Sequence, residues 1–148
     1  MTPDIKALAS ELEGYVIHMR RDFHEHPELS GKEHRTKEVL IREIEAMNLQ
    51  YRLLDGTGII AFIEGEKPGK HRVIRADIDA LPVKEDTMNL CREKECISKT
   101  DGICHACGND AHMAVLLGTM KLLTEIRGSL AGKIYCCFEE GEETNLRH

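Results

Sequence analysis

One stretch decides the fold: Asn109-Asp-Ala-His-Met-Ala-Val-Leu-Leu-Gly-Thr-Met-Lys-Leu-Leu-Thr-Glu-Ile126, followed after a short gap by Lys133-Ile-Tyr-Cys-Cys-Phe138. The apolar residues of the first part are spaced as on a helix, and Asn109 or Asp110 is expected to cap that helix. Two glycines in the gap break it. The second part is a short apolar run, which predicts a strand.

A strand also precedes this helix. The run Arg72-Val-Ile-Arg-Ala-Asp-Ile-Asp79 ends in acids, and a strand, a helix and a strand in succession predict a parallel crossover. Upstream, residues 49–54 and 59–63 are two strand-like runs around the turn Asp55-Gly-Thr-Gly58, which predicts an antiparallel hairpin. The predicted fold class is therefore α/β, with a layered mixed β-sheet flanked by helices.

Two helices are predicted before these strands. Apolar residues between positions 4 and 24 recur with the helical period, and Pro27 ends this segment because the residue before a proline avoids the helical conformation. A second helix is predicted from His34 to Met47, with Asn48 as its stop signal. Residues 81–102 are charged and without a clear period, so we predict a long loop, a feature that is often functional in a compact domain.

Composition and charge exclude several classes of function. A length of 148 residues predicts one domain with room for a sizeable core. The net charge of -6 argues against a general binder of nucleic acid, and six aromatic residues without any Trp argue against base stacking. No apolar run approaches the ~20 residues that span a bilayer, and no secretory signal is recognised. We therefore expect a cytoplasmic protein that binds neither nucleic acid nor membrane.

The six cysteines allow more than one interpretation. In a reducing compartment they are thiols unless they bind a metal. Cys136 and Cys137 lie in an apolar run and are expected to be small core residues. The others follow the spacing Cys91-x4-Cys96-x7-Cys104-x2-Cys107. This spacing leaves open a structural four-cysteine zinc site, although only one pair has the C-x2-C separation typical of such sites.

Two segments have the residue types of a hydrolytic metal site. The segment His105-Ala-Cys-Gly-Asn-Asp-Ala-His112 contains four potential ligands in eight residues, and the helix start after Cys107 would lower its thiol pKa. A buried thiol in a turn is the alternative. The pair Glu142-Glu143 follows the last strand, where one carboxylate could bind metal and the other transfer a proton, or both could be solvated. Sites of open α/β sheets lie at these strand ends.

Further candidates lie on the preceding strand and the first helix. Asp77 and Asp79 alternate along the strand and are expected to share one face with Arg75, either as ion pairs or beside a metal. His24 and His26 are two positions apart near a helix end, so they cannot easily chelate one ion together. A structural role is favoured for both histidines.

Six motifs, in order, cover nearly the whole chain. They are Arg21-Asp-Phe-His-Glu-His-Pro-Glu-Leu29, Thr57-Gly-Ile-Ile-Ala61, Arg75-Ala-Asp-Ile-Asp-Ala-Leu-Pro82, His105-Ala-Cys-Gly-Asn-Asp-Ala-His112, Leu116-Leu-Gly118 and residues 138–143. Together they resemble the N-terminal part of the metal-dependent amidohydrolases of the aminoacylase/carboxypeptidase family, in particular the branch of hippurate hydrolase, indole-acetyl-amino-acid hydrolase and N-acyl-amino-acid amidohydrolase.

The resemblance implies a role for several residues. Cys107 corresponds to a thiolate ligand between two divalent metals, and Glu143 to a carboxylate ligand. Glu142 corresponds to the general base, and Asp79 to a carboxylate that supports the site. Asn109 stands where the family usually has a His ligand. A neutral amide oxygen binds zinc more weakly than imidazole does, so one metal is expected to bind less well.

The resemblance also implies a larger protein. The family hydrolyses N-acyl amino acids or small peptides with zinc or manganese, up to two ions per site, and has an inserted smaller domain that usually dimerises. Residues 1–148 match a partial catalytic domain, without that inserted domain and without the C-terminal part of the catalytic domain. We therefore expect a homo-oligomeric hydrolase with weak or no activity from these residues alone. The alternative is a catalytically silent metal-binding or self-associating module.

Overall fold

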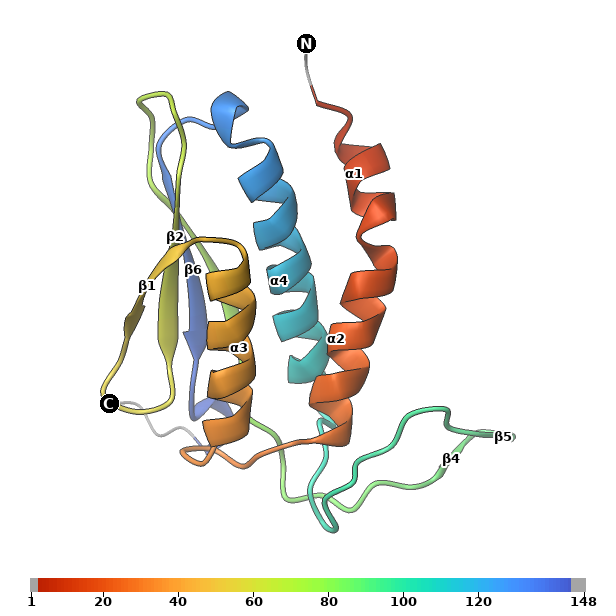
Figure 1. Cartoon of the computed structure of the whole chain (residues 1–148). Helices are drawn as coiled ribbons and strands as arrows, with labels where there is room; N and C mark the ends of the chain where they lie inside the picture. Colours follow the sequence, from red (N-terminus) through yellow and green to blue (C-terminus); the bar gives the residue numbers. More distant parts are fainter. Residues whose placement is uncertain (1–2, 145–148) are drawn as a thin grey trace.

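The computed structural model describes residues 3–144, which form a mixed sheet packed against helices (Figure 1). In chain order the elements are α1 (Ile5–Glu11), α2 (Glu13–Glu25), α3 (His34–Ala46), β1 (Gln50–Leu53), β2 (Ile59–Glu64), β3 (Arg72–Asp77), β4 (Met88–Asn89), β5 (Arg92–Glu93), α4 (Asn109–Glu125), the 3-10 turn η1 (Arg127–Ser129), β6 (Lys133–Glu139) and the 3-10 turn η2 (Glu142–Thr144). The α/β class and the mixed sheet predicted from the sequence are confirmed.

The helices begin and end close to the predicted positions. The segment predicted as one helix over residues 4–24 is two helices separated by Leu12, and Asp4 caps the first by accepting from the N–H groups of Lys6 and Ala7. The second predicted helix is α3. Asn48 follows it with a φ of 54°, the left-handed conformation common just after a helix, which confirms the predicted stop.

The strand order β1-β2-β6-β3 explains why the sheet is mixed. β1 and β2 form the predicted antiparallel hairpin, and β6 pairs antiparallel with β2. β6 pairs parallel with β3 on its other side, with α4 as the crossover between them. The last strand therefore lies between two strands that precede it by more than 50 residues in the chain.

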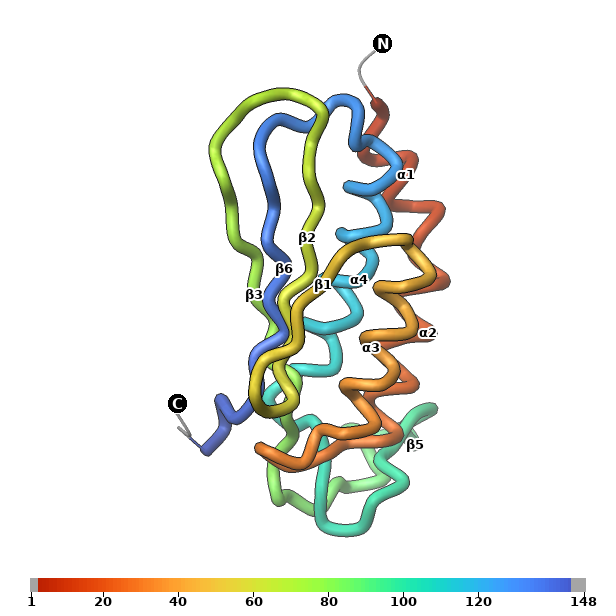
Figure 2. The backbone as a smooth tube through the Cα atoms, turned by 60° about the vertical axis from the view of Figure 1, so that its left-hand side comes forward, coloured from red at the N-terminus to blue at the C-terminus, as the bar shows by residue number. Residues whose placement is uncertain are grey.

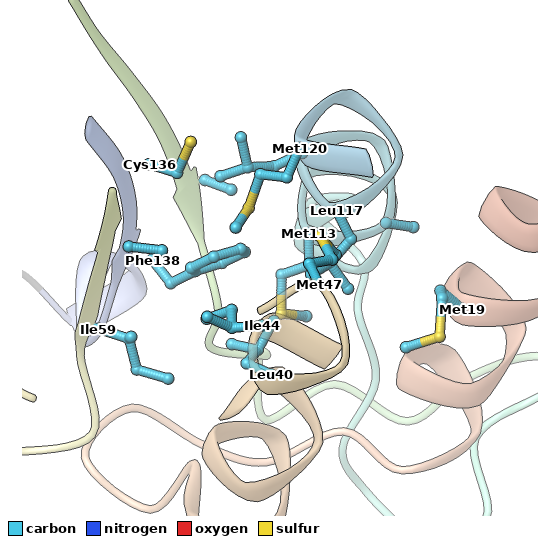
Figure 3. Close-up of a cluster of buried hydrophobic side chains, with 14 of the residues drawn as sticks. Met19, Leu40, Ile44, Met47, Ile59, Met113, Leu117, Met120, Cys136 and Phe138 are labelled. Atoms are coloured by element: carbon cyan, nitrogen blue, oxygen red, sulfur yellow. The ribbon is translucent and has the colours of Figure 1, made fainter. Parts of the chain in front are cut away.

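The core lies between one face of the sheet and the helices (Figure 2). Phe138 and Ile59 point from the sheet toward Leu40 of α3 and Met113 and Met120 of α4, and all five side chains are fully buried (Figure 3). All four helices of residues 3–144 lie on this side of the sheet, with α3 and α4 next to it and α1 and α2 packed against α4 (Figure 1). Burial of these apolar side chains is the main contribution to stability that the packing provides.

One glycine permits the close packing of α2 on α4. A Cβ atom at Gly118 would lie 2.5 Å from the Val16 side chain, closer than atoms can approach without moving. Because glycine has no side chain, the two helices can approach here, and α2 is held against the helix that begins at the candidate site.

Residues 81–106 project from the end of the helical layer, as a loop with one short hairpin of β4 and β5 (Figure 1). The predicted long loop is thus confirmed, with the hairpin as an addition. Within the described part of the chain, no helix is both long and apolar enough to cross a membrane.

Candidate active site

The candidate site lies at the edge of the sheet where β3 and β6 end. These neighbouring strands run parallel, with Asp77 opposite Glu139 at their last positions. Asp79 follows β3 by two residues, and Glu142 and Glu143 belong to η2 just after β6. Residues that follow neighbouring parallel strands meet at one edge, as the sequence predicts for this fold.

Asp79 is the centre of the hydrogen bonds at this edge. Its side chain is fully buried, and its Oδ2 accepts from the Ser30 hydroxyl at 2.6 Å and from the backbone N–H of Glu143 at 2.9 Å. Its Oδ1 is buried without a hydrogen-bond partner among residues 3–144. A buried carboxylate oxygen without a donor is costly unless a cation or water satisfies it. Ser30 was not predicted as a site residue, because in the sequence it only adjoins the first motif.

Asn109 connects Asp79 to Glu143. Asn109 is 2% exposed, and its Nδ2 donates to the Asp79 backbone carbonyl at 3.0 Å and to Glu143 Oε1 at 3.2 Å. Three of the residues singled out in the sequence are therefore in direct contact. A role of Asn109 as a metal ligand through its amide oxygen stays a prediction.

Cys107 is the fourth member of this cluster. Its thiol donates a hydrogen bond to the Glu143 carboxylate, and this bond, together with the negative charge of Glu143, raises the pKa of the thiol above its usual range. The lowered pKa expected from the sequence is therefore wrong, because the charges around the thiol are carboxylates rather than cations. Gly108, next to Cys107, has a φ of 92°, which favours glycine and allows the chain to turn into α4.

Glu142 lies at the rim of the cluster. Its side chain is exposed, and its negative charge acts on both Cys107 and Arg75. An exposed carboxylate beside this partly buried cluster, in which Cys107 is also exposed, is accessible to a substrate and to water. Its role as general base stays a prediction.

Asp77 and Asp79 do not share one environment, contrary to the expectation from the sequence. Asp77 is half-buried and forms an ion pair with Arg75, which also pairs with Glu139. β3 ends at Asp77, so the alternation of a strand does not continue to Asp79, which is directed into the protein. The ion-pair interpretation thus holds for Asp77 and not for Asp79.

His24 links α2 to the first turn of α4. Its Nδ1 lies 2.7 Å from Asp110 Oδ2, and its Nε2 lies 3.0 Å from Glu85 Oε1 of the long loop. The bond to Asp110 raises the pKa of His24, an effect that burial opposes and Glu85 supports. Arg20 Nε also contacts Asp110 Oδ2, at 2.9 Å. The Asp110 carboxylate therefore binds side chains of α2 rather than the N–H groups of α4. The N-cap of α4 is Gly108, without a side-chain hydrogen bond, so the predicted capping by Asn109 or Asp110 is wrong.

The two histidines of the segment 105–112 lie in different environments. His105 is buried, and burial lowers the pKa of its imidazole to about 4. Both of its ring nitrogens are without a hydrogen-bond partner among the described residues. His112 is exposed on α4. The sequence did not distinguish these two environments, because burial depends on how α2 packs against the loop.

Glu33 is a buried acid that the sequence analysis missed. It is fully buried, and it accepts from the Thr57 hydroxyl at 2.7 Å and from the backbone N–H of Gly141 at 3.3 Å. Gly141 immediately precedes Glu142, so Glu33 fixes the turn that carries the two site carboxylates. In the sequence Glu33 directly precedes a predicted helix, where an acid is usually exposed, so its burial was not predicted.

The four cysteines of the proposed zinc spacing are separated. Cys91, Cys96 and Cys104 line a cavity of about 760 Å³ between the end of α2 and the long loop, whereas Cys107 is hydrogen-bonded to Glu143. Within residues 3–144, no three His, Cys, Asp or Glu side chains are placed to hold one metal ion. The four-cysteine zinc site is therefore not formed, because the three cysteines that line the cavity are not grouped as ligands and Cys107 lies at the other cluster.

The cluster fits part of a metal site. The thiol of Cys107 and the carboxylate of Glu143 are donors of the kind that divalent zinc accepts, and the unpartnered Oδ1 of Asp79 adds negative charge nearby. Two such donors fit one divalent ion but do not complete its usual four ligands. Among residues 3–144, no third His, Cys, Asp or Glu side chain is grouped with these two donors.

Comparison with known proteins identifies the family of this chain. The sequence model of Peptidase family M20/M25/M40 matches residues 73–147, half of the chain, including Asp79, Cys107, Asn109 and Glu143. The chain belongs to this family. The family expected from the sequence motifs is thereby confirmed.

Three M20 relatives show the extent of the similarity. The chain is 38% identical to an N-acyl-L-amino acid amidohydrolase of Geobacillus stearothermophilus, over 95% of this chain and 37% of the relative. It is 45% identical to an N-acetylcysteine deacetylase of Bacillus subtilis, over 86% and 33%. The Bacillus subtilis YXEP structure, described as a dinuclear metal-binding peptidase of family M20, matches with a TM-score of 0.79 and 42% identity over 93% and 37%. The chain thus spans about a third of the length of these relatives.

Proposed function

We propose that this M20 chain contributes to metal-dependent hydrolysis of the amide bond of N-acyl amino acids or small peptides. The observation that supports this most directly is the contact between Cys107, Glu143, Asn109 and Asp79 at the ends of β3 and β6. Relatives named for amidohydrolase and deacetylase activity support the same substrate class. On this proposal residues 1–148 are a partial catalytic domain.

Each residue has a distinct task in this proposal. Cys107 and Glu143 would hold a divalent ion, zinc or manganese, and Asn109 contacts Glu143 beside them. When bound, such an ion supplies Lewis-acid polarisation of the substrate carbonyl and of the attacking water. Glu142 accepts the proton of that water and delivers it to the leaving amine. Asp79 holds the Glu143 backbone in place through the 2.9 Å bond.

Binding of cobalt(II) tests the ligand set, because a thiolate bound to cobalt gives a charge-transfer absorption band. We expect this band for the unchanged chain, and we expect Cys107→Ser to abolish it. We expect Glu143→Gln to lower the affinity for cobalt(II) at least tenfold. Cys91→Ser is the matched control, since Cys91 is exposed on the long loop. A band that survives Cys107→Ser would show that the ion is bound elsewhere.

Turnover of N-acetyl amino acids with added zinc or manganese tests the chemistry. We expect weak or no turnover from residues 1–148 alone, because only part of a ligand set is present. Any turnover should fall by about 10²- to 10⁴-fold in Glu142→Gln. Glu38→Gln, an exposed change on α3, is the control. Equal rates for both variants would remove Glu142 from the mechanism.

A self-associating module is the second candidate, favoured by the uncovered face of the sheet (Figure 2). Val73 is 68% exposed on this face, and it pairs in register with Tyr135, which contacts Phe62 edge-to-face. Apolar side chains of this kind commonly mark an interaction surface. We propose a cytoplasmic homo-oligomer that buries this face. Light scattering should then show that Val73→Lys lowers the mass, and an unchanged mass would contradict it.

A further inference from the structure

We infer that Asn109 is a positioning residue rather than a metal ligand. Its amide N–H group donates to the Glu143 carboxylate and orients it. This inference rests on the proposed function and deepens it, since it concerns the residue beside the two proposed ligands, which the sequence predicts as a further ligand. It is carried by hydrogen bonds among described residues and does not depend on turnover.

The contacts fix the orientation of the Asn109 amide. The two ends of an amide side chain are distinguished by their partners, because the nitrogen only donates and the oxygen only accepts. The atom that faces Glu143 Oε1 at 3.2 Å also faces the Asp79 carbonyl oxygen at 3.0 Å. A carboxylate and a carbonyl both accept. The nitrogen must therefore face them, and the amide oxygen is directed away from Glu143.

The charges explain why a donor is needed at this position. The Glu143 backbone N–H donates to the carboxylate of Asp79, which is buried and has one oxygen without a partner among the described residues. The Glu143 carboxylate is therefore attached next to a buried acid, where a hydrogen-bond donor stabilises its charged form. Asn109 is 2% exposed, and its Nδ2 donates both to the Asp79 backbone carbonyl and to Glu143 Oε1. The neutral amide thus supplies a donor to Glu143 in the absence of an ion.

A consequence follows for binding of an ion. An ion that used both Glu143 Oε1 and the Asn109 oxygen would require the amide to rotate by half a turn. Rotation would break the bond to the Asp79 carbonyl and place two oxygens face to face. The arrangement therefore leaves Cys107 and Glu143 as the protein ligands and keeps Glu143 oriented before an ion arrives.

Exchange of the two side chains tests this inference. In Asn109→Asp, two carboxylates face each other, and we expect the folding equilibrium constant to fall by about tenfold or more. In the double variant Asn109→Asp with Glu143→Gln, the donor and acceptor are interchanged. We expect this variant to recover at least half of the decrease in the urea midpoint that Asn109→Asp causes. All measurements are made by urea denaturation with a chelator present, so they are independent of any metal and of the proposed function.

The controls make either outcome decisive. Asn89→Asp is the same change at an exposed residue of β4, and it should leave the midpoint unchanged with or without Glu143→Gln. If Asn109→Asp does not fold, the coupling is measured from Asn109→Ala and Glu143→Ala, singly and together. A coupling of fivefold or more in either cycle supports the N–H bond, and effects that multiply independently would overturn it.

Discussion

Glu85→Gln should destabilise this protein in a manner that depends on pH. Burial raises the pKa of Glu85, but hydrogen bonds from the Ser98 backbone, His24 and Lys94 outweigh it and lower the pKa from 4.5 to about 2. Because the side chain is only 10% exposed, solvent screens these bonds little. A lowering of this size corresponds to about 3 kcal/mol of stability at pH 7.

The sign of the pH effect follows from the lowered pKa. A carboxylate with a depressed pKa stabilises the folded chain above its unfolded pKa of 4.5, and this contribution is lost as the pH falls toward 2. It should have declined to about 1.4 kcal/mol by pH 3. A glutamine still accepts from the Ser98 N–H, so we expect Glu85→Gln to cost about 1–3 kcal/mol at pH 7 and progressively less at lower pH.

Urea denaturation followed by circular dichroism, from pH 7 to pH 3, measures this difference. Glu93→Gln is the matched control, since Glu93 is exposed on β5 a few residues away. The reasoning is refuted if the two variants have the same urea midpoint at pH 7, or if the difference between Glu85→Gln and the unchanged chain grows as the pH falls.

Three further predictions concern the packing of the core and the link between α2 and α4. Gly118→Ala should cost about 1–3 kcal/mol in urea denaturation because its methyl group meets Val16, whereas Gly14→Ala, with nothing within 4 Å, should be neutral or slightly stabilising. Phe138→Ala should cost about 3–5 kcal/mol, and a loss below 1 kcal/mol would mean that the core repacks. The raised pKa of His24 should make stability fall as the pH rises through that value, above 6.5, and an NMR titration of the imidazole checks this.

The parts of the fold with strong local patterns could be predicted from the sequence. The spacing of apolar residues in α3 and α4 and the acids that end β3 are local properties, and they indicate the elements and the edge of the sheet that holds the site. The break at Leu12 was missed because the apolar period continues through it. Pairing of Cys107 with Glu143, 36 positions away, came from the family motifs rather than from any local pattern.

The environments of the charged residues could not be predicted, because each depends on tertiary contacts. Asp110 has the residue type of a helix cap, yet a histidine and an arginine from α2 engage it. Glu33 has the residue type of a surface acid, but it is fully buried against Thr57. In both cases the partner lies more than 20 positions away, which no local pattern records.

The central place of β6 in the sheet has a consequence for synthesis on the ribosome. β2 and β3 do not pair with each other in the sheet, and each pairs with β6. Between the end of β3 at Asp77 and the end of β6 at Glu139, translation at ~5–20 residues per second takes roughly 3–12 s. During that interval β2 has β1 as a neighbour but lacks β6, so one edge of the β1–β2 hairpin stays unpaired and is open to incorrect pairing.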